Sequence, residues 1–139
     1  MILVDTSFFY ALASTTDADH ERVREVFETL DAKRLPDLCL TTNHVVAEAI
    51  TLARSSSDHE HAVRLGERLY AESLARIHWT TPDEEREAFT YFKKHRDKDY
   101  SFVDCLSFVV MQARGILEAL TLDGDFTHRF VPRPGPRAR

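Results

Sequence analysis

Short apolar segments alternate with longer amphipathic segments along this chain of 139 residues, and this alternation constrains the fold more than any other feature. Apolar runs predict β-strands at residues 1–5, 38–41, 77–79 and 118–122. Apolar residues at helical spacing predict helices from residue 17 or 19 to 30, from 42 or 43 to 54, around 62–69, from 81 through 92, and over 102–113. Alternating strands and helices form parallel sheets through right-handed crossovers. We therefore predict the α/β class, with a short central parallel sheet flanked by helices.

Two local features refine this pattern. The segment Leu35-Pro36-Asp37 interrupts the apolar periodicity, so we expect a break there. Further along, Thr81 followed by a proline and acids is typical of a helix start, and we expect Phe89 and Phe92 to anchor that helix.

The size and the 43% hydrophobic content of the chain fit one compact domain. We place that domain at residues 1–130, because residues 131–139 combine Pro, Gly and Arg and are expected to form a flexible tail, frayed or extended. Cys39 and Cys105 lie far apart and form no CxxC pair, which argues against a disulfide framework and favours a cytoplasmic location. The longest internal apolar run, near 102–111, is about half of what a bilayer requires, so no membrane span is expected.

The charge of the chain only partly suits a nucleic-acid binder. Its formal net charge is −5, which lacks the global basic signature of many such proteins. Local basic patches could still meet phosphate, and two are visible. They comprise Lys93, Lys94, Arg96 and Lys98, followed by Tyr100, and Arg129, Arg133, Arg137 and Arg139. For each patch, RNA contact and a merely solvated surface remain open.

Two aspartates follow predicted strands directly. Asp5 closes the first strand, and Asp123 follows the last one, with Asp125 two residues later across Gly124. In open parallel sheets, binding sites form at the carboxyl ends of the strands, where these acids would meet. The alternatives are structural, because Asp is a good helix N-cap and Asp-Gly-Asp is a turn signal.

Two further acids lie on predicted helices. Glu48 shares a helix face with Val45 and Leu52, a face that we expect to be buried, unless Glu48 pairs with an arginine such as Arg54 or the helix turns it toward solvent. Asp104 interrupts a helix that is otherwise apolar nearly all round, although Ser101 and Asp104 also fit a capping box.

Taken together, these acids predict a site for a hard cation. Clustered carboxylates repel one another, and Mg²⁺ takes oxygen ligands, with Mn²⁺ as an expected substitute. Competing chemistries have weaker support, since the sequence contains no GxxxxGK[ST] phosphate loop and no GxSxG elbow. His59 and His61 are spaced so that their rings diverge on a helix, which argues against zinc.

At these residues the chain resembles the PIN-domain ribonucleases, specifically the VapC-type toxins of toxin–antitoxin pairs. The resemblance rests on four segments that occur in the order of the family. They are MILVDTSFFYAL at 1–12, TTNHVVAEAITL at 41–52, YSFVDCLSFVVM at 100–111 and ALTLDGDF at 119–126.

The resemblance implies a PIN-like three-layer α/β/α fold and a Mg²⁺-dependent endoribonuclease that hydrolyses structured RNA, tRNA or rRNA, with a metal-activated water. It makes Asp5, Glu48, Asp104 and Asp123 the catalytic acids, with the metal on the three aspartates. It also makes Thr6 and Thr121 supporting hydroxyls, and Asp125 an alternate fourth acid.

The expected partners are a second copy of the chain and an antitoxin that inserts a helix and a basic side chain at the acidic site. Two alternatives stay open: a PIN-type nuclease for RNA processing or single-stranded DNA outside a toxin system, and a non-catalytic module that binds RNA or protein.

Overall fold

The computed structural model describes residues 1–124 and 131–134, which form a parallel sheet between layers of helices. The strand order is β3-β2-β1-β4-β5, and every neighbouring pair is parallel. The strands are β1 (Ile2–Val4), β2 (Cys39–Thr42), β3 (Arg76–His78), β4 (Glu118–Thr121) and β5 (Val131–Pro134). This arrangement confirms the predicted α/β class with a short central parallel sheet.

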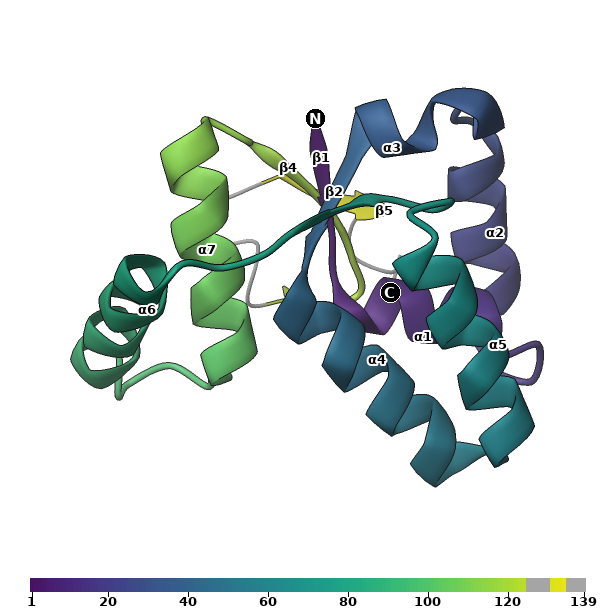
Figure 1. The fold of residues 1–139 in the computed structure, drawn as a ribbon, viewed down its shortest axis with the longest axis horizontal. Helices are drawn as coiled ribbons and strands as arrows, with labels where there is room; N and C mark the ends of the chain where they lie inside the picture. The colour runs from purple at the N-terminus through teal and green to yellow at the C-terminus, as the bar shows by residue number, and fades with distance from the viewer. Residues whose placement is uncertain (125–130, 135–139) are drawn as a thin grey trace.

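The helices divide between the two faces of the sheet (Figure 1). They are α1 (Thr6–Ala13), α2 (His20–Glu28), α3 (Leu35–Leu38), α4 (Asn43–Ser56), α5 (His59–Tyr70), α6 (Pro82–Lys94) and α7 (Phe102–Arg114), with a short 3₁₀ turn at Ala32–Arg34. α6 and α7 pack together on one side, whereas α1, α2, α4 and α5 lie on the other. None of the helices in the described ranges is both long and apolar enough to span a membrane.

Alternation along the strands produces two separate hydrophobic cores. Leu3 belongs to the core under α6 and α7, while its neighbour Val4 belongs to the core under α1, α4 and α5. The register keeps this alternation in step across the sheet, because Leu3 pairs with Leu40 on one side and Ala119 on the other, all in the same core. Both faces of the central strands are therefore buried, as their continuous apolar runs predict.

Two parts of the chain differ from the sequence-based expectation. The segment predicted as a break at Leu35-Pro36-Asp37 is helical, since Pro36 lies in the first turn of α3, where its missing N–H costs nothing. The Pro- and Arg-rich tail is extended over Val131–Pro134, which pairs with β4 as an edge strand. Proline is tolerated at an edge because no further strand needs its N–H. The domain boundary after residue 130 remains a prediction.

Phe89 and Phe92, which were expected to anchor α6, lie at the surface rather than in a core. Phe89 is 52% exposed and Phe92 is 40% exposed, and Ala88 is the buried residue of this helix. Both rings instead contact Phe102 edge to face at the surface, each at 6.2 Å between centroids.

The end of α7 offers a test of the backbone. Gly115 caps this helix in the left-handed region, at φ 66°, and no atom lies within 4 Å of where a Cβ would be. Gly115→Ala should therefore lower the free energy of unfolding by about 1 kcal/mol through backbone strain alone. Urea denaturation would measure the change, with Gly115→Asn as the control, because Asn tolerates this conformation better. Equal stability of the Ala variant and the wild type would contradict the assignment.

Candidate active site

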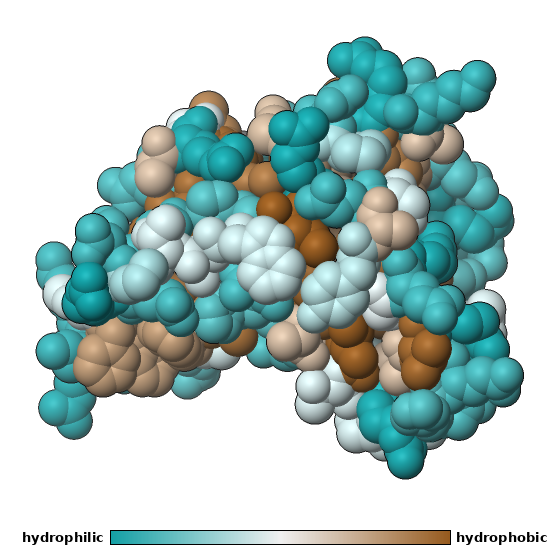
Figure 2. Space-filling model, in the orientation of Figure 1, coloured by the Kyte–Doolittle hydropathy of each residue, from teal (hydrophilic) through white to brown (hydrophobic). Residues whose placement is uncertain are grey.

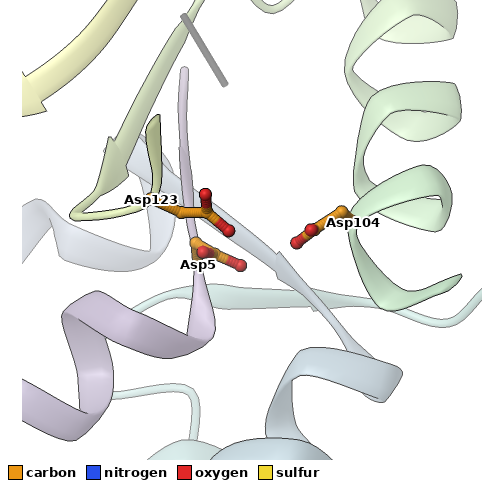
Figure 3. A group of neighbouring side chains, drawn as sticks. All are labelled: Asp5, Asp104 and Asp123. Atoms are coloured by element: carbon orange, nitrogen blue, oxygen red, sulfur yellow. The ribbon is translucent and has the colours of Figure 1, made fainter. Parts of the chain in front are cut away.

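Three aspartates from separate parts of the chain meet at the carboxyl edge of the sheet. Asp5 follows β1, Asp123 follows β4 by two residues, and Asp104 lies in the first turn of α7. A carboxylate oxygen of each lies within 4.8 Å of those of the other two. Figure 3 shows the side chain of Asp104 pointing from α7 toward the carboxylates of Asp5 and Asp123. The parallel topology brings the strand ends together, and the packing of α7 on the sheet adds the third acid.

Asp5 is the most constrained of the three. It occupies the N-cap position of α1, yet its side chain makes no capping hydrogen bond. Helix capping therefore does not explain where its carboxylate lies. Instead, Oδ2 accepts hydrogen bonds from Thr121 Oγ1 at 3.1 Å and from Ser7 Oγ at 3.3 Å. Its backbone N–H donates to the carbonyl of Leu120, which ties the residue to β4.

Burial, together with the neighbouring carboxylate of Asp104, raises the pKa of Asp5 to about 7. The side chain is only 3% exposed, so its charged form lacks hydration, while hydrogen bonds from the backbone N–H of Thr6 and the hydroxyl of Thr121 lower the pKa by less. A carboxylate in this position gains stability from a bound cation, because the cation offsets both the lost water and the repulsion.

Asp104 serves the helix and the cluster at once. Its backbone N–H donates to Ser101 Oγ, and its Oδ2 accepts from the backbone N–H of Ser101, which completes the capping box. The two interpretations of this residue are therefore compatible, because the carboxylate that closes the box also has an oxygen within 4.8 Å of those of Asp5 and Asp123. A buried carboxylate at the N-terminus of α7 also gains from the helix dipole.

The supporting hydroxyls differ in part from the expectation. Thr121 matches it, since its Oγ1 donates to Asp5 and accepts from the backbone N–H of Asp123. The Thr6 hydroxyl does not, because it is buried with no hydrogen-bond partner among the described residues. Ser7 makes the contacts instead, to Asp5, to Thr121 Oγ1 at 3.4 Å and from the N–H of Leu122. Helical geometry explains this, because Ser7 lies one residue further around the first turn of α1.

Glu48 belongs to the wall of the site but lies outside the close group. A pocket of about 320 Å³ is lined by Asp5, Thr6, Ser7, Glu48, Leu52, Asp99, Ser101, Asp104 and Asp123. The expected burial of the Glu48 face is wrong, because both Glu48 and Leu52 are exposed. No ion pair of Glu48, with Arg54 or any other residue, occurs within the described ranges. Glu48 therefore stands free at the mouth of an acidic pocket.

The remaining predicted residues lie at or beyond this pocket. Lys93, Arg96 and Lys98 line an adjacent cavity, and Lys94 is exposed at the end of α6. Asp125 and Arg129 lie outside the described residues. Asp123 lies in the cluster, and the choice between Asp123 and Asp125 as the fourth acid remains a prediction.

A short parallel sheet between helical layers, with aspartates converging at its carboxyl edge, defines the PIN class of α/β domains. The sequence profile of the PIN domain matches residues 2–129, and the chain belongs to this family. This confirms the family resemblance and the PIN-like fold.

The relatives are toxins of the VapC type. The chain is 35% identical over 127 residues to "23S rRNA-specific endonuclease VapC20" of two strains of Mycobacterium tuberculosis, covering 91% of this chain and 92% of the relative. It also matches the crystal structure of Mycobacterium tuberculosis VapC20, described as a Sarcin-Ricin loop cleaving toxin, with a TM-score of 0.83, 34% identity and coverage of 92% and 94% of the two chains.

The raised pKa of Asp5 predicts a pH-dependent stability of the metal-free protein. The unfolded chain loses this proton near its ordinary pKa of 3.8, whereas the folded chain keeps it to about 7. The contribution of Asp5 to the free energy of unfolding is therefore fully present below pH 4. It is lost, by a few kcal/mol in total, as the pH rises from about 4 through 7. Asp5→Asn should remove this fall, so in EDTA the variant should melt above the wild type at pH 8 and close to it at pH 4.5. Parallel pH profiles would contradict the assignment.

Thr121 allows a test of how the acids are positioned. Thr121→Val preserves shape but removes the hydroxyl that links Asp5 to the backbone of Asp123. We expect Mn²⁺ to bind about 10- to 100-fold more weakly, because such supporting contacts orient the ligands. Calorimetric titration of Mn²⁺ would measure this, with Thr121→Ser as the matched control that keeps the hydroxyl. Unchanged affinity in the Val variant would show that Thr121 only fills space.

Proposed function

We propose that this protein is a Mg²⁺-dependent endoribonuclease of the VapC type, the toxin of a toxin–antitoxin pair, with ribosomal RNA as its substrate. The observation that carries the proposal is the convergence of Asp5, Asp104 and Asp123 within 4.8 Å at the edge of a PIN fold. The class of RNA follows from relatives that are named as 23S rRNA-specific and Sarcin-Ricin loop cleaving, and that share nearly the whole chain.

The donor set suits a hard cation. Three carboxylates supply oxygen ligands, and one of them is buried with a raised pKa, so a divalent cation would relieve the repulsion of the group. When bound there, Mg²⁺ would lower the pKa of a water molecule and offset charge on the scissile phosphate. Mn²⁺ offers the same ligand preference.

The residues of the acidic pocket have different roles in this proposal. Asp5, Asp104 and Asp123 would hold the cation, while Thr121 and Ser7 orient the carboxylate of Asp5 through its Oδ2. Glu48, exposed at the mouth of the same pocket, is placed to accept a hydrogen bond from the attacking water on a carboxylate oxygen. Attack in line on the phosphate leaves a 5′-phosphate and a 3′-hydroxyl.

The partners are part of this proposal. An antitoxin would insert a helix near the site and place an Arg or Lys against the acids, since a guanidinium or ammonium can neutralise the same carboxylates that hold the cation. A homodimer and a cytoplasmic location fit the resemblance to VapC-type toxins. The basic patch at Lys93, Lys94, Arg96 and Lys98 would contact RNA phosphates, together with Arg129.

Cleavage of RNA tests the proposal directly. Purified protein is incubated with 23S rRNA and with total tRNA in Mg²⁺, Mn²⁺ or EDTA, and product ends are mapped. We expect discrete cuts in 23S rRNA that EDTA abolishes and that carry a 5′-phosphate.

Matched carboxamide variants assign the roles of the acids. Asp104→Asn should lose cleavage by at least about 100-fold, since it keeps an oxygen for the N–H of Ser101 but loses the charge. Glu48→Gln should lower kcat while leaving Mn²⁺ affinity nearly unchanged. Products with 2′,3′-cyclic phosphates, or cleavage that persists in EDTA and in Asp104→Asn, would refute the metal-based mechanism.

A further inference from the structure

A second cavity borders the acidic pocket. It has a volume of about 560 Å³ and is lined by Phe89, Phe92, Lys93, His95, Arg96, Lys98, Asp99 and Tyr100, and we call it the aromatic pocket. Asp99 lines both pockets, so the two are neighbours on one surface. We propose that the aromatic pocket receives an unstacked nucleotide of the RNA strand next to the phosphate that is cut. This inference rests on the proposed ribonuclease function.

The exposed rings of α6 supply the first argument. Phe89 and Phe92 leave about half of their surfaces in solvent, at 52% and 40%, and both line the same pocket. Figure 2 shows hydrophobic side chains gathered on the surface over the lower end of α6. Bases that leave a stack bind to aromatic side chains, and every base can do so regardless of sequence.

The inner wall of the pocket is rigid. Tyr100 is only 6% exposed, and its ring packs edge to face on Phe108 at 5.0 Å and stacks on Tyr91 at 6.1 Å. The ring of His95 stacks on Tyr91 at 3.9 Å, and its Nδ1 lies 2.9 Å from the Tyr91 carbonyl oxygen. These contacts continue into the core under α7. The pocket is therefore preorganised for a ligand.

The charge of the pocket selects the occupant. Three cations, Lys93, Arg96 and Lys98, face one carboxylate, Asp99, on a protein whose net charge is −5. The ammonium of Lys93 lies 5.2 Å from the centre of the Phe89 ring, which keeps a cation beside an aromatic surface. Cations next to aromatic rings suit a nucleotide, because a cation can bind its phosphate while a ring stacks on its base.

A second copy of the chain fits this surface less well. In a two-fold dimer the same patch faces itself, so the cations of one pocket would lie against those of the other. A polyanion has no such conflict. A strand whose scissile phosphate lies at Asp5, Asp104 and Asp123 would pass Asp99 and place a neighbouring base at Phe89 and Phe92.

Two double variants separate stacking from packing. Phe89→Leu with Phe92→Leu keeps apolar bulk against Phe102 but removes the flat ring faces, and Phe89→Ala with Phe92→Ala removes both. We expect each to raise KM for 23S rRNA cleavage about tenfold, with kcat and the Mn²⁺ affinity nearly unchanged. Tyr70→Ala is the control, because Tyr70 is an aromatic residue of α5 that is 55% exposed and outside the pocket.

A fluorescent base locates the contact. RNA substrates carrying 2-aminopurine at single positions around the cut are titrated with Asp104→Asn protein, which leaves them intact. Quenching should occur at one or two positions beside the scissile phosphate and should be lost when both Phe→Leu changes are added. Quenching that persists would overturn the proposal.

The outcomes distinguish the two levels of inference. Wild-type protein that cleaves no RNA would refute the proposed function itself. Wild-type cleavage with an unchanged KM in the Leu variant would refute the aromatic pocket alone, as would a shift from dimer to monomer in sedimentation of that variant, which would assign the pocket to self-association.

Discussion

The repulsion between buried carboxylates is the constraint on which the rest of the structure depends. Asp5 and Asp104 are 3% and 7% exposed and lie in one cluster with Asp123. Side chains free to move would separate to regain water. They stay together because β1 and β4 are packed into both cores and α7 into the core beneath it, and because hydrogen bonds from Thr121 and Ser7 hold Asp5. Hydrophobic packing of the strands and of α7 thus keeps the three carboxylates together against their mutual repulsion.

The same residues stabilise secondary structure and form the site. The Asp5 carbonyl accepts hydrogen bonds from the N–H groups of Phe8 and Phe9 and so starts α1, while its carboxylate faces the cluster. Asp104 closes the capping box of α7 with one oxygen. In the sequence, capping and metal binding look like rival interpretations. In the structure one residue does both, because Asp104 closes the capping box and also lies in the acidic cluster, so evidence for a cap is not evidence against a ligand.

The sequence predicted the parts of this protein in which local pattern and burial agree. β1, β2 and β4 are apolar runs buried on both faces, and the acids that follow β1 and β4 could be placed because strand ends meet at one edge. The helix α1 was not given a residue range, although Asp5 was expected to close the strand before it and occupies the N-cap of this helix. The rotation of a helix was the weakest inference. Spacing alone left open whether Glu48 is buried or turned toward solvent, and it did not predict that Phe89 and Phe92 lie at the surface, as all three do in the structure.

Those outward-facing residues give the surface its organisation. The acidic pocket by itself repels a phosphate, so an RNA strand needs cations elsewhere to approach it. Lys93, Arg96 and Lys98 line the neighbouring aromatic pocket, which shares Asp99 with the acidic pocket. In the proposed function, affinity for RNA and cleavage of RNA are therefore carried by two adjoining surfaces of opposite charge. A chain with a negative net charge can serve as a ribonuclease under this arrangement, because the strand meets local charge rather than the average of the whole molecule.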